Sequence, residues 1–131
     1  MATNRRELHL DIPADKAWAA VSDFGQVHTK VAPGFLTALT MDGGDRIVTF
    51  FNGHVARERL VTLDDADKRL VYTIVEGRAS HYAAAVQVFA DGPSQSRLIW
   101  TIDFLPDELA PGLAGMVDHA LPLMKKTLEA A

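Results

Sequence analysis

Six short runs of strand-forming residues follow one another through the middle of the chain, separated only by turn-length connections. The expected strands are Phe35–Met41, Arg46–Phe51, Val55–Leu63, Arg69–Val75, His81–Ala90 and Arg97–Leu105. The connections are rich in Asp, Asn and Gly, which favour the backbone angles of tight turns. Because every connection has the length of a hairpin, the six strands are predicted to form an antiparallel meander.

One strand and a short helical region precede the meander. Leu8, Leu10 and Ile12 alternate with polar residues, which predicts a strand that runs to about Ile12 and stops at Pro13. Asp15 is placed to cap a helix that ends at Gly25, and one further helical turn can follow over residues 26–31. The expected buried face of that helix is Ala17, Trp18, Val21 and Phe24.

After Pro106 the apolar spacing changes from two residues to three and four, which predicts a long helix capped by Asp107. Pro111 and Pro122 should delimit or kink this helix, because proline lacks the N–H of an intrahelical hydrogen bond. The expected fold class is α+β: a seven-stranded antiparallel sheet curled around a long carboxy-terminal helix, with one or two short helices between strands one and two. One helix cannot fill a curled sheet, so we expect a cavity of a few hundred Å³ between them.

The composition fits a single domain over residues 1–131 with its own core. The chain is 48% hydrophobic and 23% charged, which is too apolar for a disordered protein. Its formal net charge of −4 argues against binding to nucleic acid or to an anionic membrane surface. No segment has the length of a membrane span or the pattern of a signal peptide, so we expect a cytoplasmic, bacterial protein without stable membrane insertion.

Several kinds of site are excluded by what the sequence lacks. With no cysteine, the chain cannot form disulfides, thiolate zinc sites, iron–sulfur clusters or a cysteine nucleophile. None of its five histidines has the spacing of a metal-ligand motif, so no metal is expected. The sequence also has no phosphate-binding loop, dinucleotide fingerprint or serine-hydrolase elbow, so we expect no cofactor.

Four segments, taken with the order of the elements, carry a resemblance that covers nearly the whole chain. They are Ile12–Asp15 leading into Ala17-Trp18, then Arg57–Leu60, Lys68–Gly77 and His81–Ala84. Together they resemble the SRPBCC or START-like superfamily, and more narrowly its bacterial polyketide cyclase/dehydrase-like branch. The resemblance implies the helix-grip fold. It leaves the reaction open, because members include lipid carriers, hormone receptors, cyclases and isomerases.

The resemblance also implies positions for candidate site residues. Glu58 matches a glutamate that faces the cavity, Tyr82 matches a cavity tyrosine, and Arg46 matches an arginine near the cavity mouth. Thr37 departs from the pattern, since the related plant hormone receptors have a ligand-anchoring lysine there. This departure argues against an abscisate-like carboxylate ligand.

Whether Glu58 faces the cavity depends on the hairpin around Asn52-Gly53, since a glutamate between two arginines can equally be a solvated strand charge. A two-residue turn pairs Phe51 with His54 and puts Glu58 on the face of Ile47. A three-residue loop, with Gly53 in the left-handed region, pairs Phe51 with Val55 and puts Glu58 on the face of Arg46. Only the second register agrees with the resemblance, and we adopt it.

On that face Glu58 would stand among aromatic side chains. Burial there should raise its pKa unless Arg46 or a hydroxyl group stabilises the anion. A neutral acid can donate a proton and an anion can accept one, while the Tyr82 hydroxyl can orient a carbonyl or enolate oxygen. A packed tyrosine without a chemical role is an equal possibility for Tyr82.

Two hypotheses from different classes follow. The first is binding of a hydrophobic small molecule, apolar or aromatic and polyketide- or lipid-like, in the cavity. The second is a cyclase, dehydratase or isomerase that uses Glu58 as general acid or base with Tyr82 and Arg46. A third reading is a domain with a collapsed cavity that acts through its outer surface. The expected ligand-binding wall is Phe50, Tyr72, Ile74, Trp100, Leu113, Met116 and Met124.

Overall fold

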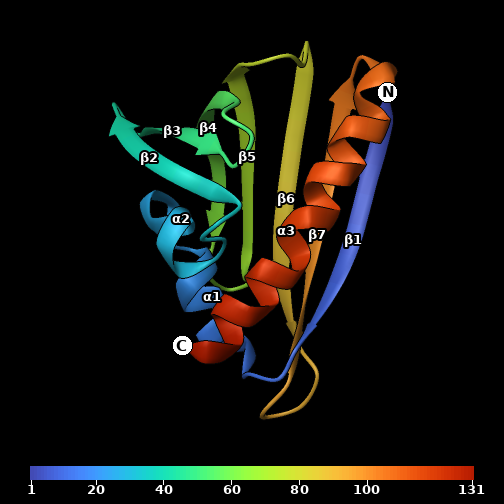
Figure 1. Ribbon diagram of the computed structural model, residues 1–131. Helices are drawn as coiled ribbons and strands as arrows, with labels where there is room; N and C mark the ends of the chain where they lie inside the picture. The colour runs from blue at the N-terminus through green and yellow to red at the C-terminus, as the bar shows by residue number, and fades with distance from the viewer.

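A computed structural model describes residues 1–131, and its seven strands form one antiparallel sheet. The strands are β1 (Ala2–Leu10), β2 (Leu36–Asp42), β3 (Asp45–Phe50), β4 (Val55–Asp64), β5 (Arg69–Glu76), β6 (His81–Ala90) and β7 (Ser96–Leu105). Their order in the sheet is β1-β7-β6-β5-β4-β3-β2, so β2 to β7 form the predicted meander and β1 pairs with β7 (Figure 1).

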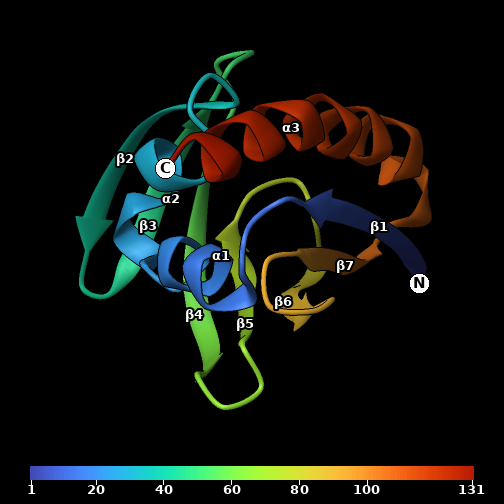
Figure 2. The same ribbon diagram turned by 90° about the horizontal axis from the view of Figure 1, so that it is seen from below.

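The helices fall where the periodicity predicts them. α1 (Ala14–Val21), a 3₁₀ helix (Phe24–Gln26) and α2 (Val27–Lys30) connect β1 at one sheet edge to β2 at the other. A second 3₁₀ helix (Asp107–Leu109) leads into α3 (Ala110–Ala130). Figure 2 shows the sheet as a curved wall with α3 lying across its open side. The predicted fold class is therefore confirmed. No helix is both long and apolar enough to cross a membrane.

Two register shifts help to bend the sheet where β4 meets β5. They lie between Arg57 and Glu58 and between Leu60 and Thr62. Such bulges bend a strand and increase its local twist. Val61, inside the second shift, is 60% exposed, which accounts for an apolar residue on the outside of this strand.

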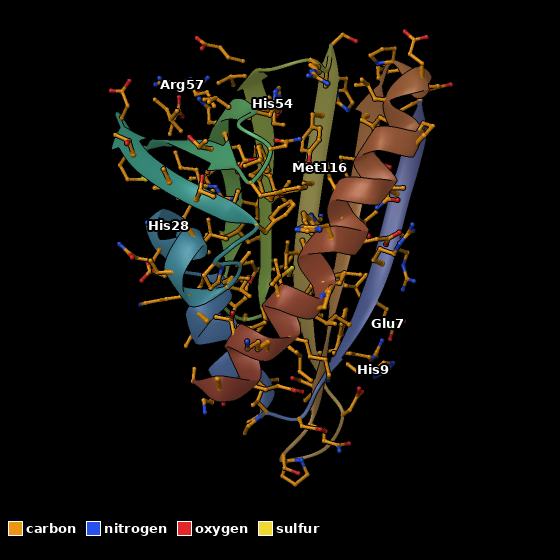
Figure 3. The ribbon with its side chains drawn as sticks, viewed as in Figure 1. Glu7, His9, His28, His54, Arg57 and Met116 are labelled. Carbon is orange, nitrogen blue, oxygen red and sulfur yellow. The ribbon has the colours of Figure 1, made fainter.

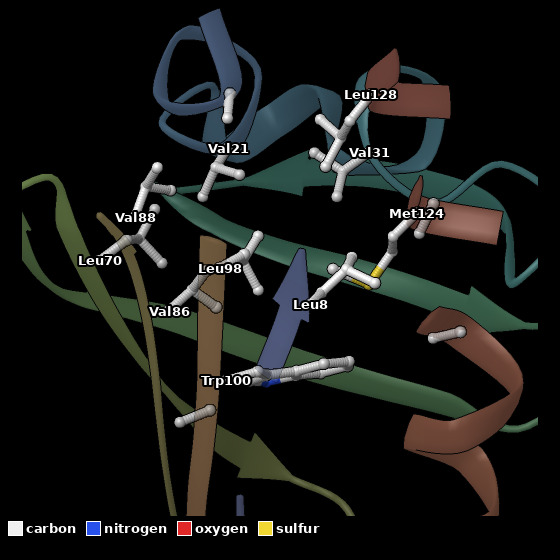
Figure 4. Packing of buried hydrophobic residues seen from close by; sticks show 14 of the residues in the cluster. Leu8, Val21, Val31, Leu70, Val86, Val88, Leu98, Trp100, Met124 and Leu128 are labelled. Atoms are coloured by element: carbon white, nitrogen blue, oxygen red, sulfur yellow. The ribbon is translucent and has the colours of Figure 1, made fainter. Parts of the chain in front are cut away.

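The core lies between the inner sheet face and the carboxy-terminal half of α3. Alternate residues of β6 and β7 are buried there: Ala84, Val86, Val88, Leu98, Trp100, Ile102 and Phe104. They meet the buried residues of α3, which are Val117, Ala120, Met124 and Leu128. Figure 4 shows Met124 and Leu128 close to Val31 and Leu8, so the short helices and β1 close this end of the molecule.

The first strand differs from its prediction at both ends. It begins at Ala2, whereas the apolar alternation is visible only from Leu8. The earlier part is concealed because the inward positions Asn4 and Arg6 are polar: Asn4 is buried and Arg6 binds Asp118 at 2.8 Å. It ends at Leu10 instead of Ile12, since the Asp11 N–H turns away to donate to Glu129 at 2.8 Å.

The predicted helix caps are also wrong. Pro13 occupies the cap position of α1, and Asp15 lies within the first turn, 3.2 Å from the Lys68 ammonium. α1 ends at Val21 instead of Gly25.

In the last helix, Asp107 belongs to the 3₁₀ helix, where it binds the amino terminus at 3.2 Å. Pro111 lies in the first turn of α3, where its missing N–H costs no hydrogen bond, and the helix continues through Pro122.

The hairpin between β3 and β4 has neither of the two registers considered from the sequence. Its turn starts one residue earlier, because the Phe51 N–H leaves the ladder to bond the Phe35 carbonyl, and the Phe50 N–H bonds the His54 carbonyl. Arg46 therefore pairs directly with Glu58. The shift from the adopted register is two residues, so the facing of every side chain is unchanged, and Gly53 has the expected positive φ of 86°.

A pair of leucine substitutions tests the position of the core. Leu10 is 2% exposed in β1 and Leu63 is 47% exposed in β4. Leu10→Ala should lower the free energy of unfolding by about 2–5 kcal/mol, because it leaves a cavity in packed surroundings. Leu63→Ala should cost less than about 1 kcal/mol. Urea denaturation of both variants measures the difference, and equal losses would contradict this assignment of the core.

Candidate functional site

A cavity of about 350 Å³ lies between the inner sheet face and α3. Thirty residues line it, and 23 of them are hydrophobic. All ten candidates from the sequence are on its wall: Arg46, Phe50, Glu58, Tyr72, Ile74, Tyr82, Trp100, Leu113, Met116 and Met124. The space between sheet and helix is thus not filled by protein side chains.

Two loops and the start of α3 surround one end of the cavity, the upper end in Figure 1. The β3–β4 loop contributes Asn52 and His54, the β5–β6 loop contributes residues 77–79, and the helix contributes Gly112 and Met116. The Asn52 amide lies 3.7 Å from the Met116 sulfur, which brings the hairpin against the helix (Figure 3). We call this end the mouth.

The most unusual feature of the wall is a buried ion pair. Arg46 Nε donates to Glu58 Oε1 at 2.8 Å, and the two side chains are only 5% and 6% exposed. Their direct pairing across β3 and β4 brings them together on the inner face. The resemblance puts the arginine near the mouth, whereas the structure buries Arg46 beneath the region between α1 and α2.

Contacts from distant parts of the chain hold the Arg46 guanidinium in place. Its Nη1 donates to the Phe24 carbonyl at 3.1 Å. The Phe24 ring centroid lies 4.0 Å from Cζ, and the Tyr72 ring centroid lies 4.8 Å from it. A guanidinium placed over aromatic faces is stabilised by the cation–π interaction, so Arg46 is fixed in the orientation that meets Glu58.

Burial governs the protonation of Glu58. Loss of solvation raises the pKa of its carboxyl group, and the charge and hydrogen bond of Arg46 oppose this rise only in part. Arg46 occupies one carboxyl oxygen, and no other hydrogen bond engages the group. Glu58 can therefore exchange a proton with a ligand while its position stays fixed.

Two tyrosines stand beside this pair. The ring centroids of Tyr72 and Tyr82 are 6.3 Å apart. Burial raises the pKa of Tyr72 far above its usual value and also raises that of Tyr82, and the charge of Glu58 adds to both shifts. Both hydroxyl groups therefore stay protonated and can donate hydrogen bonds.

A third polar group on the wall belongs to Trp100. Its indole Nε1 is buried and has no hydrogen-bond partner. Trp100 and Tyr72 both line the cavity. From the sequence, Tyr72 and Trp100 are predicted only as members of the apolar wall, because alternation reveals the facing of a side chain but not its polar neighbours.

The arginines that flank Glu58 belong to the other face of the sheet. Arg57 and Arg59 bind Asp45 at 2.7 and 2.9 Å, and Arg57 also binds Asp42 at 2.9 Å. The two arginines lower the pKa of Asp45 to about 2. These groups are separated from the cavity by the alternation of side chains along β4. No group of three or more His, Asp or Glu side chains is placed to hold a metal ion.

Removing Arg46 tests the electrostatics of the pair. Arg46→Met leaves a buried carboxyl group without its cation, so the pKa of Glu58 should rise further and the free energy of unfolding should fall by about 3–5 kcal/mol at neutral pH. A raised folded-state pKa gives stability that is present below the usual glutamate pKa and is lost as pH rises through the raised value. The loss in this variant should therefore grow with pH.

Carboxyl NMR titration and urea denaturation at several pH values measure these effects. Arg5→Met, at an exposed position on the outer face, is the matched control and should change stability by less than about 0.5 kcal/mol. A loss in Arg46→Met that does not depend on pH would contradict the burial of Glu58 as the cause of its shift.

Comparison with known proteins agrees with this geometry. The family model described as "Polyketide cyclase / dehydrase and lipid transport" matches residues 1–131. Comparison with curated protein sequences gives no match. Among solved structures, an uncharacterized protein of Bacillus thuringiensis has a TM-score of 0.84 at 18% identity, with 97% of this chain and 98% of that chain covered.

Two further structures are similar over most of their length. A Thermobifida fusca protein has a TM-score of 0.79 at 26% identity, with coverages of 99% and 91%. A norcoclaurine synthase point mutant of Thalictrum flavum, in complex with a transition-state analogue, has a TM-score of 0.74 at 18% identity, with coverages of 97% and 93%. The fold is therefore shared widely, and the family match spans the whole sequence. The chain belongs to the polyketide cyclase / dehydrase and lipid transport family of the SRPBCC superfamily.

Proposed function

We propose that the protein binds an apolar or aromatic small molecule, polyketide- or lipid-like, in the cavity between the sheet and α3. The observation that carries this proposal is a space of about 350 Å³ whose wall is hydrophobic at 23 of 30 residues and polar at only a few places. Ligand sites in proteins typically combine a mostly apolar wall with a few polar groups that orient the ligand. The predicted location remains the cytoplasm of a bacterium.

The polar groups in the wall define what the ligand should offer. Tyr72 and Tyr82 are neutral donors, and Glu58 is a donor when protonated and an acceptor when ionised. A ketone, enol or phenol oxygen would find a partner here, whereas a purely hydrocarbon ligand would leave these groups unpaired at a cost. The proposed ligand therefore carries at least one oxygen near Glu58.

Acid–base catalysis is the second candidate function, and the raised pKa of Glu58 beside two neutral tyrosines favours it. Glu58 would take a proton from, or give one to, a carbon or hydroxyl group, while Tyr82 donates to the carbonyl oxygen that gains negative charge. Arg46 would stabilise the Glu58 anion, which is present before Glu58 takes a proton or after it gives one. This chemistry fits a cyclase, dehydratase or isomerase.

The residue types on the cavity wall further restrict the reactions that the protein could catalyse. It contains no lysine to form an imine and no serine, threonine or cysteine nucleophile. A norcoclaurine synthase of similar fold has been solved in complex with dopamine and hydroxybenzaldehyde. For the present chain, proton transfer by Glu58 is the reaction type that the wall supports.

Two conservative substitutions distinguish a binding protein from an enzyme. The small molecules that copurify with the protein are first identified by mass spectrometry. In an enzyme, Glu58→Gln should lower turnover of the identified compound by about 10²–10⁴ and change its affinity only a few-fold, because the amide keeps the shape but cannot transfer a proton. In a binding protein, Glu58→Gln and Tyr82→Phe should each weaken affinity by roughly 1–3 kcal/mol.

Glu76→Gln is the matched control, since Glu76 is exposed at the end of β5 and absent from the wall. It should alter neither turnover nor affinity. Calorimetry measures affinity and product analysis measures turnover. If no small molecule copurifies and neither substitution changes the binding of any apolar compound tested, the cavity is not the functional site.

A further inference from the structure

The charges on the cavity wall do not cancel. Only three of its residues are Arg, Lys, Asp or Glu, and two of them, Arg46 and Glu58, form an ion pair at 2.8 Å. The third is Arg78, an exposed residue of the β5–β6 loop at the mouth. It takes part in none of the ion pairs or side-chain hydrogen bonds of the structure. The wall therefore presents one unpaired positive charge.

The surroundings of Arg78 do not neutralise this charge. The other polar residues of the mouth are Asn52 and His54, neither of which is negative. The acidic residues near the mouth in sequence are absent from the wall, and one of them, Asp107, already binds the amino terminus at 3.2 Å. A positive mouth on a chain with a net charge of −4 is a local feature that overall composition does not reveal.

The mouth is also organised as a polar rim. The Asn52 side-chain oxygen accepts from the His54 backbone N–H at 3.1 Å, and the His54 ring stacks on Phe50 with centroids 5.9 Å apart. Figure 3 shows His54 in this loop, at the same end as Met116 of α3. Polar side chains thus gather at the mouth, while the interior beyond it is mostly apolar.

We propose that the ligand is an amphiphile with an anionic head group, whose head is held at the mouth by Arg78 while the rest of the molecule, which is mostly apolar, fills the cavity. This inference rests on the proposed function and adds the class of ligand. A guanidinium pairs well with a carboxylate, because its N–H groups match the two carboxylate oxygens. A head at the mouth stays partly hydrated, so it avoids the large cost of burying a charge.

The position of this cation differs from the one that the resemblance to plant hormone receptors would suggest. Thr37, at the place of their anchoring lysine, does not line the cavity. The absence of a lysine at position 37 therefore bears only on a carboxylate held inside the cavity, and a carboxylate at the mouth has a separate partner in Arg78.

Three probes with the same eight-carbon chain test the inference: octanoate, 1-octanol and octyltrimethylammonium, below their micelle concentrations and at a pH where octanoate is ionised. Calorimetry with the full chain should give octanoate a roughly three- to tenfold higher affinity than 1-octanol, the usual size of a partly exposed charge interaction. Added salt should weaken the binding of octanoate and leave that of 1-octanol unchanged.

Variants assign the preference to Arg78. Arg78→Gln should remove the preference for octanoate without changing the affinity for 1-octanol, and Arg78→Lys should keep part of the preference. Arg5→Gln, which removes an exposed and unpaired arginine from the outer face, should change neither affinity. Because Arg78 lies in an exposed loop, circular dichroism should show the same folded spectrum for all variants.

The outcomes separate this inference from the proposed function. If octanoate and 1-octanol bind equally, if octyltrimethylammonium binds most tightly, or if Arg78→Gln weakens both uncharged and anionic probes alike, the inference is wrong but cavity binding stands. If none of the three probes binds, the inference is wrong, and the proposed function is decided separately by the compounds that copurify with the protein.

Discussion

A curled seven-stranded sheet covered by one helix is the constraint on which the rest of the structure depends. A curved sheet encloses more space than a single helix can fill, so side chains can pack closely along only part of the helix. Here Met124 and Leu128 of α3 pack with Val31 and Leu8 at the end that the short helices close (Figure 4). Towards the other end, the sheet and α3 leave a cavity of about 350 Å³ between them.

The Arg46–Glu58 pair does not stabilise the fold in the way that this apolar packing does. Removing two charges from water is costly, and a well-packed apolar pair in their place is often neutral or stabilising. The contacts of Arg46 to the Phe24 carbonyl and to two aromatic rings offset part of the cost. Burial raises the pKa of the Glu58 carboxyl group, and this shift is one basis of the role towards a ligand that we propose for it.

The similarity to other proteins supports the fold more strongly than the reaction. The structures compared above share 18–26% of their residues with this chain, and one fold accommodates many unrelated functions. The function therefore has to be inferred from individual wall residues. The absence of lysine from the wall, the proton exchange open to Glu58 and the unpaired charge of Arg78 are properties of this chain and not of its fold.

The sequence alone determined the order of the elements and the facing of most strand residues, because alternation and turn chemistry are local. It failed at β1, where inward Asn4 and Arg6 break the apolar pattern; the partner of Arg6 is Asp118 of α3, which no local pattern reveals. It also gave the right face but the wrong partner for Glu58, since a register error of two residues preserves facing.

Only the tertiary structure decided what surrounds each candidate residue. The partners of Arg46 come from β4, β5 and the segment between α1 and α2, and no local pattern specifies such distant contacts. The place of Arg78 on the mouth likewise depends on where a loop ends relative to α3. Periodicity reports the direction of a side chain from its own strand, whereas the chemistry of a site depends on which other strands and helices reach the same point.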